Sequence, residues 1–500
     1  MGDEPRGVAA SQGPSRRSGG GWRALLLLWL ALVAGRATLS TVWMPEAGVG
    51  LGDTEAYYTA WSYDLMWGYH DHPGAIAWLI ALARQVVGAG GAPRVVAATA
   101  QAATLALLMV YWRGLCGERG ALLGAAVFMA IPIYGTGGLL AAPDAPLAAA
   151  WAGAALAASR ASSWRGWAAA GGCVGLAVLS KLFGVALWVA IVSEAWRSTS
   201  EVKERVRRVG VVTLGGVAGL VPTLWFEATH GWTGLRYHAL ERHAGAWLDP
   251  LHGAGVVGAH LLVLSPVLGG LLVWALVAGG RSQARRLTLT TLAPLGLMMV
   301  MTRESEPHWA ALPWMTLLGP MAVSAWERRP GWLSAGVVVG AALQGLLWCH
   351  VMTPLGLNVI PKERYVPRYD LSNDLYGWGE VAERSRRALD DGSVDRVVGY
   401  HYTVCGQLAA GLGGLESVWC ASRRRDAFDA LLGGRAGRGE VGERLLYVRD
   451  NRYDEQGPAR LVCDAWGDEE RLVVTRGGRV SHWYGLRRCD GFRGLTPGAP

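Results

Sequence analysis

Long apolar runs constrain the fold of this chain more than any other feature. Runs of about 16 to 25 mostly apolar residues recur along the first 352 residues and then cease. A helix of that length matches the hydrocarbon thickness of a bilayer. In agreement, 51% of the 500 residues are hydrophobic, only 17% are charged, and the mean hydropathy is +0.22. These values exclude a disordered chain and a small disulfide scaffold, and they predict a polytopic α-helical membrane protein.

We expect about eleven transmembrane helices from these runs. They are predicted at residues 22–43, 94–112, 121–135, 146–158, 166–179, 182–196, 209–226, 254–278, 287–301, 309–325 and 332–351. A cleaved signal peptide is the alternative for the first run, which is too long for a signal h-region. The apolar stretch 72–88 is predicted as an interfacial helix on the outer face, because counting it as a span disrupts the charge alternation of every later loop.

Basic residues predict the orientation, since lysine and arginine remain on the cytoplasmic side. They gather in alternate loops, near residues 113–119, 160–165, 197–208, 281–286 and 328–329. We therefore expect these loops and the N-terminal tail, residues 1–21, in the cytoplasm. The remaining loops carry the acids and histidines, and the first outer loop covers residues 45–93. The chemistry is thus expected to face the periplasm.

The composition becomes polar after residue 352. We expect residues 22–352 to form a membrane domain and residues 353–500 to form a periplasmic α/β domain. Strands are predicted at 395–400, 416–419 and 444–448, and helices at 379–389, 403–412 and 425–432.

Four cysteines lie in this C-terminal region, at Cys405, Cys420, Cys463 and Cys489. Disulfides persist outside the cytoplasm, and four cysteines allow three pairings. We favour Cys405–Cys420 and Cys463–Cys489, because these partners are near each other along the chain. The spacing fits no zinc finger.

Acidic, histidine and aromatic side chains are concentrated in the first outer loop. The ionisable members are Asp53, Glu55, Asp64, His70, Asp71 and His72. An aromatic belt with solvated acids is the alternative explanation, but belts seldom gather so many ionisable groups. This loop is therefore the strongest candidate for a functional site.

The loop resembles a known family. Glu55-Ala-Tyr-Tyr-x-x-Trp-Ser and Gly68-Tyr-x-Asp-His-Pro are similar to the first outer loop of the dolichyl-phosphate-mannose-protein mannosyltransferase and ArnT-like aminoarabinose transferase group, integral glycosyltransferases of the GT-C fold (glycosyltransferase families 39 and 83). Further matching motifs follow in order: Ala142-Pro-Asp-Ala-Pro, Gly175-Leu-Ala-Val-Leu-Ser-Lys, His230-Gly-Trp with Arg242-His, Glu306-Pro-His-Trp and Gly377-Trp. The resemblance extends over about residues 22 to 410.

This resemblance implies transfer of a sugar from a polyprenyl-phosphate carrier to a lipid, protein or glycan acceptor. An acceptor hydroxyl needs a carboxylate base, whereas a phosphate leaving group needs cations. The family places an acidic pair directly before Ala-Tyr-Tyr and uses its first acid as the presumed base. Thr54 occupies that aligned position here, so Asp53 and Glu55 both remain candidate bases, with Asp53 preferred.

Asp144 and Lys181 are the next candidates, since the family motifs include both. Asp144 is predicted as a catalytic residue, and the alternative is a helix cap before Pro146. Lys181 is predicted to hold the carrier phosphate, and the alternative is a lysine that snorkels to the membrane interface.

The predicted substrate-binding set is distributed along the outer loops. It consists of Tyr57, Tyr58, His70, Asp71, His72, Lys181, His230, Trp232, Arg242, His243, Glu306 and His308. Cations among aromatic rings suit a phosphate and a sugar face. For residues 227–243 the alternative is a solvated amphipathic segment, and for residues 303–308 it is a charged loop that ends a helix.

Cofactor and partners are less constrained by the sequence. A divalent metal ion between Asp53 or Glu55 and the donor phosphate is compatible with the residues, but no dense ligand cluster requires one. The net charge of +8 first reflects membrane topology and does not imply nucleic acid. A bacterial inner-membrane protein is expected. The rival functions are an inactive GT-C relative that acts as a scaffold, and a lipid or glycan transporter, which would need charges within the spans.

Overall fold

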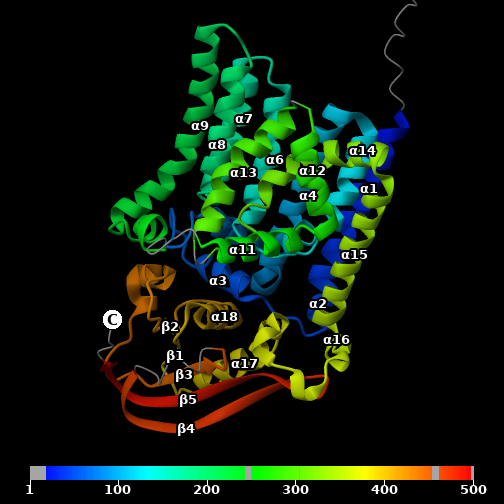
Figure 1. Cartoon of the computed structure of the whole chain (residues 1–500). Helices are drawn as coiled ribbons and strands as arrows, with labels where there is room; N and C mark the ends of the chain where they lie inside the picture. The colour runs from blue at the N-terminus through cyan, green and yellow to red at the C-terminus, as the bar shows by residue number, and fades with distance from the viewer. Residues whose placement is uncertain (1–18, 243–248, 281, 303–304, 453–460, 497–500) are drawn as a thin grey trace, which may run out of the picture.

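The structure is a computed structural model that describes residues 19–242, 249–280, 282–302, 305–452 and 461–496. It is mostly helical and ends in a mixed five-stranded sheet. Figure 1 shows the helices side by side, with the sheet at the end opposite the start of α1 (Gly19–Thr38). The predicted combination of a helical membrane part with a C-terminal α/β part is therefore confirmed.

The helical part contains α1 and a series of long and short helices and helical turns. They are η1 (Leu39–Trp43), α2 (Met44–Glu46), α3 (Asp53–Trp61), α4 (Ala75–Ala130), α5 (Pro132–Gly135), η2 (Gly137–Leu139), α6 (Asp144–Arg160), α7 (Trp164–Ser180), α8 (Gly184–Arg197), α9 (Val202–Thr229), α10 (Thr233–Arg236), η3 (Tyr237–Glu241), α11 (Pro250–Val263), α12 (Pro266–Ala278), α13 (Gln283–Met301), η4 (Leu312–Leu317), α14 (Leu318–Arg328) and α15 (Pro330–Met352).

The helices of the structure that are long and apolar enough to cross a membrane are fewer than the eleven spans predicted from the sequence. In the described part of the chain, four helical stretches are long and apolar enough to cross a membrane: Leu25–Glu46, Ala75–Ala130, Val202–Thr229 and Pro330–Met352. The pair α11 and α12 would make a fifth if it counts as one bent span. The chain is therefore an integral membrane protein with several candidate spans, and the predicted number of eleven is not confirmed.

Breaks in the helical backbone occur at two of the predicted apolar runs. The run 254–278 is not one straight helix, because α11 and α12 meet at an angle of 104°. The bend follows from Ser265, whose φ is 67°, and from Pro266, which lacks the N–H that would continue the helix. The predicted helix 72–88 corresponds to the first part of α4, which begins at Ala75 and is separated from the rest of α4 by a non-helical break at Gly88, whose φ is 74°.

The C-terminal part begins with short turns and continues as an α/β unit. Its elements are α16 (Leu355–Val359), η5 (Lys362–Arg364), η6 (Pro367–Tyr369), η7 (Leu371–Leu375), α17 (Trp378–Asp390), β1 (Arg396–Gly399), α18 (Tyr402–Leu412), β2 (Val418–Cys420), η8 (Ala427–Asp429), η9 (Leu431–Gly437), β3 (Leu445–Asp450), β4 (Leu461–Arg476) and β5 (Arg479–Leu495). The three predicted strands and two of the three predicted helices coincide with these elements. The predicted helix 425–432 is wrong, because Gly433 and Gly434 adopt positive φ and the segment forms 3-10 turns.

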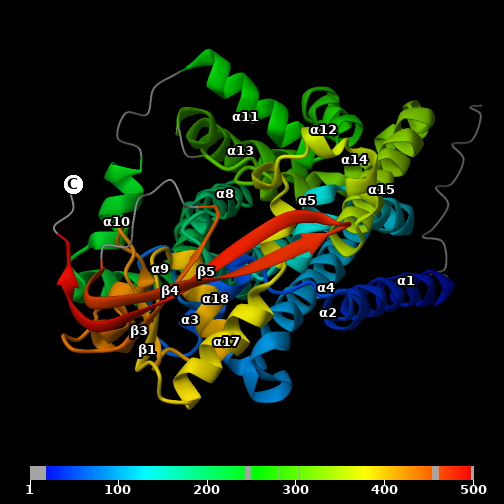
Figure 2. The ribbon, with the colours of Figure 1, turned by 90° about the horizontal axis from the view of Figure 1, so that it is seen from below.

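The sheet has the strand order β2-β1-β3-β5-β4. β1 pairs in parallel with β2 and β3, whereas β3–β5 and β4–β5 are antiparallel. Strands β4 and β5 form a long hairpin across the sheet and helices α17 and α18 (Figure 2). Its turn contains Gly477 and Gly478, whose φ values of 57° and 70° suit the tight turn of a hairpin.

Both predicted disulfides are confirmed. Cys405 and Cys420 join α18 to β2, with their Cα atoms 5.5 Å apart. Cys463 and Cys489 join β4 to β5, with a Cα separation of 5.6 Å. Among the described residues, Cys116, Cys173 and Cys349 are free.

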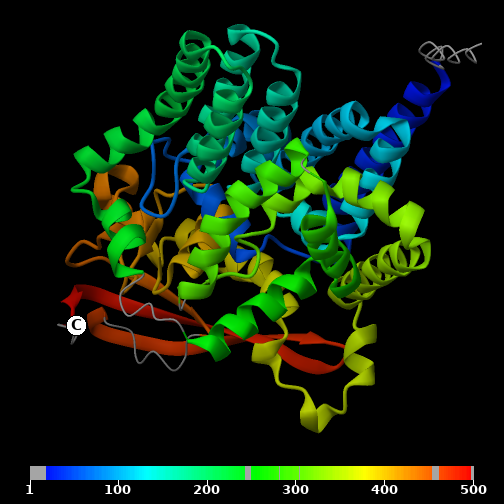
Figure 3. The same ribbon diagram turned by 45° about the horizontal axis from the view of Figure 1, so that its top comes forward.

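One buried cluster joins the helical part to the C-terminal part. It includes Tyr57, Trp61 and Tyr69 from the first outer loop, together with Trp378 and Phe428 from the C-terminal part. In the tilted view of Figure 3 the two parts adjoin, and the red hairpin crosses the lower half of the picture below most of the green helices. The first outer loop is therefore fixed between them.

Candidate active site

A cavity of about 950 Å³ lies where the first outer loop meets the helices. Its polar side chains include Thr54, Tyr58, Asp71, His72, Gln101, Thr104, Tyr134, Asp144, Lys181, His238, Arg242, Glu306 and His308. Its apolar side chains include Phe128, Val185, Val189, Leu295, Met298 and Met315. Val185 and Val189 on α8 are also 41% and 57% exposed, so the apolar part of the cavity reaches the outer surface of the helices.

Helix α3 presents two different faces to its surroundings. Glu55 at the third helical position accepts a hydrogen bond from the Gly52 N–H (3.0 Å), which closes the first turn. Residues four apart share a helix face, so Thr54 and Tyr58 line the cavity. Asp53 and Tyr57 share the other face, which packs against the C-terminal part.

The ion pair between Lys181 and Asp144 forms one wall of the cavity. The Lys181 Nζ lies 2.8 Å and 3.1 Å from the two Asp144 carboxylate oxygens. It also lies 4.7 Å from the centroid of the Phe183 ring. Lys181 is only 5% exposed, so the snorkelling interpretation is wrong. Asp144 is the first residue of α6, and both of its carboxylate oxygens contact the Lys181 ammonium group, which favours a functional role over a helix cap.

The imidazole rings of His72, His238 and His308 and the guanidinium group of Arg242 also line the cavity. Burial lowers the pKa of His238 to about 4 and that of His308 to about 4. Burial, with Lys181 nearby, also lowers the pKa of His72. These rings are therefore neutral at pH 7 without substrate, and the fixed positive charge of this wall comes from Lys181 and Arg242. The Arg242 guanidinium lies 4.7 Å from the centroid of the Trp309 ring.

Asp71 connects the cavity to the C-terminal part. Its Oδ2 accepts a hydrogen bond from the Tyr57 hydroxyl (2.5 Å), and its Oδ1 lies 3.3 Å from Nη2 of Arg424. The Arg424 guanidinium lies 4.2 Å from the centroid of the Tyr402 ring. The sequence analysis did not identify Arg424 or Tyr402, although three consecutive arginines, residues 423–425, marked this position.

The two acids predicted as candidate bases lie outside this cavity. Asp53 forms an ion pair with Arg452 (2.5 Å) and accepts a hydrogen bond from Gln407 (3.2 Å). Glu55 is 1% exposed, and its carboxylate accepts hydrogen bonds from the N–H groups of Gly52 and Ala141. Burial raises the pKa of Glu55.

Several other predicted residues also lie away from the cavity lining. His70 is buried and its ring lies 5.6 Å from that of Tyr237, whereas His230 stacks on Phe226 at 4.1 Å. Trp232 is 49% exposed. His243 lies outside the described residues. The cavity thus brings together Tyr58, Asp71, His72, Asp144, Lys181, Arg242, Glu306 and His308, with Tyr57 directly behind Asp71.

The structure adds Thr54 and His238, which the sequence analysis did not propose as site residues, to the cavity lining.

In the described part of the chain, no group of three or more His, Cys, Asp or Glu side chains is arranged to hold a metal ion. The arrangement can hold an anion beside Lys181 and Arg242, and Asp71 and Glu306 offer carboxylates on the same cavity.

Comparison with known proteins supports the resemblance seen in the motifs. Residues 71–226 match the model of the dolichyl-phosphate-mannose-protein mannosyltransferase family. Asp71, His72, Asp144 and Lys181 fall within this match. No curated protein sequence matches the chain significantly.

The fold is similar to that of ArnT from Cupriavidus metallidurans. The crystal structure of ArnT bound to undecaprenyl phosphate aligns with a TM-score of 0.60 and 14% identity, over 94% of this chain and 98% of that chain. The apo state of ArnT gives a TM-score of 0.60, 15% identity and the same coverage. The archaeal oligosaccharyltransferase AglB from Archaeoglobus fulgidus, in complex with an inhibitory peptide and a dolichol-phosphate, is less similar, with a TM-score of 0.47, 11% identity and coverage of 82% and 65%. The predicted resemblance is therefore confirmed.

Proposed function

We propose that this protein is a glycosyltransferase that moves a sugar from a polyprenyl-phosphate carrier to a lipid, protein or glycan acceptor. The reaction takes place in the 950 Å³ cavity. The match of residues 71–226 to a family of mannosyltransferases and the ArnT-like fold both support this assignment.

The amphiphilic character of the cavity is the observation that carries the proposal. Lys181 and Arg242 provide positive charge in the polar part, where a phosphate binds. Val185, Val189 and Leu295 line the apolar part, which accepts the first isoprene units. Because Val189 is 57% exposed on α8, the carrier lipid can extend from the cavity into the bilayer.

The lining suits departure of a phosphate from the anomeric carbon of the sugar. The leaving phosphate gains negative charge as the bond breaks, and preorganised cations stabilise that charge. Asp144 acts on Lys181, because both of its oxygens contact the ammonium group and keep it directed at the cavity. Neutral His72, His238 and His308 can donate hydrogen bonds to phosphate or sugar oxygens.

We assign the site to the extracytoplasmic face of the membrane, in a bacterial inner membrane. The two disulfides of the C-terminal part support this side, because such bonds persist in oxidising compartments. The arginine-rich loops support it independently, since they are the alternate loops that the positive-inside rule places in the cytoplasm.

The proposal can be tested with purified protein in nanodiscs. The donors are undecaprenyl-phosphate-linked ¹⁴C-hexoses and ¹⁴C-pentoses, and the acceptors are a membrane lipid extract and a periplasmic protein extract. We expect label to move from at least one donor. Lys181→Ala should reduce both undecaprenyl phosphate binding and transfer by roughly 10- to 100-fold, since it removes a charge-assisted contact.

Lys203→Ala provides the matched control, because Lys203 is an exposed lysine at the start of α9, away from the cavity. It should bind and transfer like the wild type. Binding of undecaprenyl phosphate without any transfer would favour an inactive GT-C relative. In sealed proteoliposomes, movement of labelled lipid from one leaflet to the other without transfer would favour a transporter.

A further inference from the structure

Thr54 occupies the position at which the related family has its presumed base. Another carboxylate must therefore receive the proton of the acceptor hydroxyl. Neither Asp53 nor Glu55 lines the cavity. Asp144 does, but the Lys181 ammonium group contacts both of its oxygens, at 3.1 Å and 2.8 Å, and the proposed function gives Asp144 the role of directing that cation at the cavity. Among the described residues, Asp71 and Glu306 are the remaining acids on the lining, and Glu306 is exposed to solvent.

Asp71 is held in one orientation by two groups from different parts of the chain. Tyr57 donates to Oδ2 at 2.5 Å, and Arg424 approaches Oδ1 at 3.3 Å. A carboxylate has about four lone-pair sites, so two contacts leave room for an acceptor hydroxyl. The Asp71 side chain is only 12% exposed, and Arg424 compensates the charge that would otherwise be costly at this depth.

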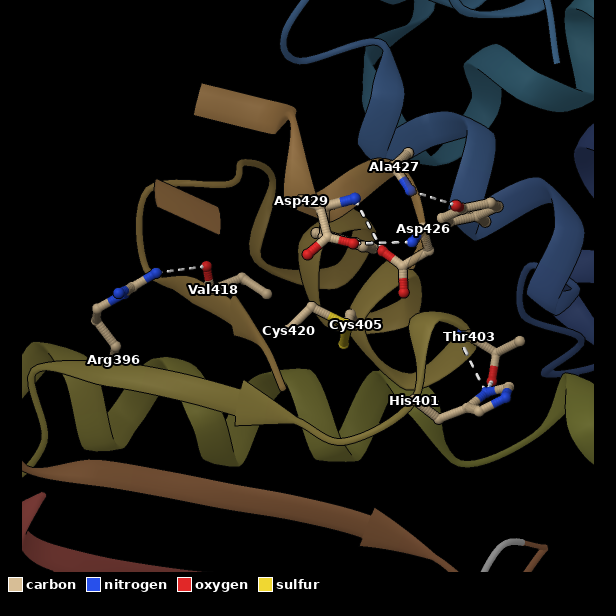
Figure 4. Close-up of a disulfide and its surroundings, with 11 residues drawn as sticks. Arg396, His401, Thr403, Cys405, Val418, Cys420, Asp426, Ala427 and Asp429 are labelled. Atoms are coloured by element: carbon tan, nitrogen blue, oxygen red, sulfur yellow. Dashed lines mark hydrogen bonds between the residues drawn. A yellow bond between two sulfur atoms is a disulfide. The ribbon is translucent and has the colours of Figure 1, made fainter. Parts of the chain in front are cut away.

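The partners of Asp71 are themselves fixed by the C-terminal part. The Ala427 N–H donates to the Tyr57 hydroxyl oxygen at 3.0 Å, and the Tyr57 and Tyr402 rings meet edge to face at 4.9 Å. Figure 4 shows Ala427 and Asp426 in the segment that follows the Cys405–Cys420 disulfide. The disulfide anchors the chain four residues before Arg424, which limits how far this segment can move.

We propose, on the basis of the proposed function, that Asp71 is the catalytic base for the acceptor and that Arg424 is its positioning residue. The acceptor oxygen attacks the anomeric carbon of the donor while its O–H proton passes to an Asp71 carboxylate oxygen. The bond between the anomeric carbon and the phosphate oxygen breaks, and its electron pair leaves with the polyprenyl phosphate. The protonated Asp71 and the phosphate dianion balance the initial carboxylate and phosphodiester monoanion.

Under this assignment the C-terminal part completes the active site. Without Arg424, Asp71 would lose its positive partner and one of its two orienting contacts. The titratable and charged groups around Asp71 come from three directions and are Tyr57, Tyr58, His238, Tyr402, Arg424 and Asp426. Arg424 is the cation among them at pH 7, because burial keeps the pKa of His238 near 4.

The test measures single-turnover rate against pH, using the donor and acceptor that give turnover with the wild type. Asp71→Asn should lower the rate by about 10²- to 10⁴-fold, as expected for loss of a general base. Undecaprenyl phosphate binding should change by no more than about twofold, because the base acts in the transition state and not in carrier binding.

The Arg424 variants separate positioning from a purely structural role. Arg424→Gln should lower the rate at pH 7 by roughly tenfold or more and move the acid limb of the pH–rate profile upward, because the negative carboxylate of Asp71 loses its cationic partner. Arg424→Lys keeps the positive charge, so its acid limb should lie between those of Arg424→Gln and the wild type. Arg423→Gln, the same charge change one residue away at an exposed position, should leave rate and profile unchanged.

Failure of this inference and failure of the proposed function give different results. If the wild type transfers sugar and Asp71→Asn keeps the full rate, Asp71 is not the base. A pH profile of Arg424→Gln that coincides with that of the wild type would remove the positioning role. Loss of rate in Glu306→Gln with normal Asp71→Asn would assign the base to Glu306 instead. A wild type that transfers no sugar from any donor would overturn the proposed function itself.

Discussion

Asp53 and Thr54 are adjacent in the sequence but face two different cavities. Thr54 lines the cavity of about 950 Å³, whereas Asp53 lines a smaller one of about 360 Å³ beside Arg452. The roughly 100° rotation between neighbouring residues of a helix produces this separation. A shift of one residue in the position of an acid therefore moves its carboxylate from the candidate active site to the contact with the C-terminal part.

This relationship predicts that Asp53 has a structural role. Asp53→Asn should destabilise the protein by about 1–3 kcal/mol, because it weakens the half-buried ion pair with Arg452 (2.5 Å). Single-turnover rate at saturating donor should stay within a fewfold of the wild type. Thermal unfolding in detergent and transfer in nanodiscs measure the two effects. A loss of rate by a hundredfold or more, with normal stability, would instead support Asp53 as the base.

The Cys405–Cys420 disulfide is predicted to matter for both stability and rate. Replacing both cysteines with serine should cost about 2–4 kcal/mol and should lower the transfer rate, because the segment that carries Arg424 loses its anchor. The matched control is removal of Cys463–Cys489, which joins the strands of the hairpin. That change should reduce stability with little effect on rate. Equal rates in both double variants would show that the first disulfide does not support the site.

The same disulfides predict a thiol count. Alkylation of the unreduced, denatured protein should modify only the three free cysteines, Cys116, Cys173 and Cys349. Mass spectrometry of the digested protein gives this number directly. Modification of Cys405 or Cys463 without a reductant would contradict the disulfides and remove one support for the extracytoplasmic assignment.

Asp426 predicts a pH dependence of stability. Burial raises the pKa of this carboxyl from 3.8 to about 7, with Asp429 and Asp71 adding repulsion. The folded chain then binds more protons than the unfolded chain between these two pH values, so stability falls as pH rises from about 4 to 7. Asp426→Asn should remove this cost, which reaches up to about 4 kcal/mol above pH 7.

Thermal unfolding followed by tryptophan fluorescence tests this at pH 4.5 and pH 8. Asp426→Asn should raise the melting temperature at pH 8 and change it little at pH 4.5. Asp390→Asn is the control, since Asp390 is the exposed last residue of α17. An equal effect of Asp426→Asn at both pH values would contradict the raised pKa.

The orientation predicted from the arginine-rich loops can be tested by cysteine labelling. A cysteine at Gln283, introduced without Cys116, Cys173 and Cys349, should react with a membrane-impermeant maleimide only from the cytoplasmic side. A cysteine at Asp468, exposed on β4, should react only from outside. Reaction of residue 283 from outside would reverse the orientation and the compartment assigned to the cavity.

Local sequence patterns predicted the helices and strands whose formation depends mainly on residues close together in the chain. Apolar runs predicted helices α6 to α9 and α13 to α15, and alternating short runs predicted β1 and β3. The hairpin β4–β5 was not predicted, because charged and half-exposed side chains on both faces weaken the alternation that marks a strand. Gly477-Gly478 was the available signal for its turn. The bend between α11 and α12 was likewise signalled only by Pro266.

The sequence alone determined that this is a helical membrane protein with an α/β C-terminal part. Membrane-spanning helices need long apolar runs and half-buried strands need alternating apolar residues, and both patterns can be recognised in the sequence. It also identified Asp71, Lys181 and Arg242 as candidate residues through their motifs. Only the tertiary structure decided which acids reach the cavity. Arg424 approaches Asp71 across 353 residues and Arg452 approaches Asp53 across 399 residues. Such contacts depend on how separate elements pack, and no local periodicity in the sequence records them.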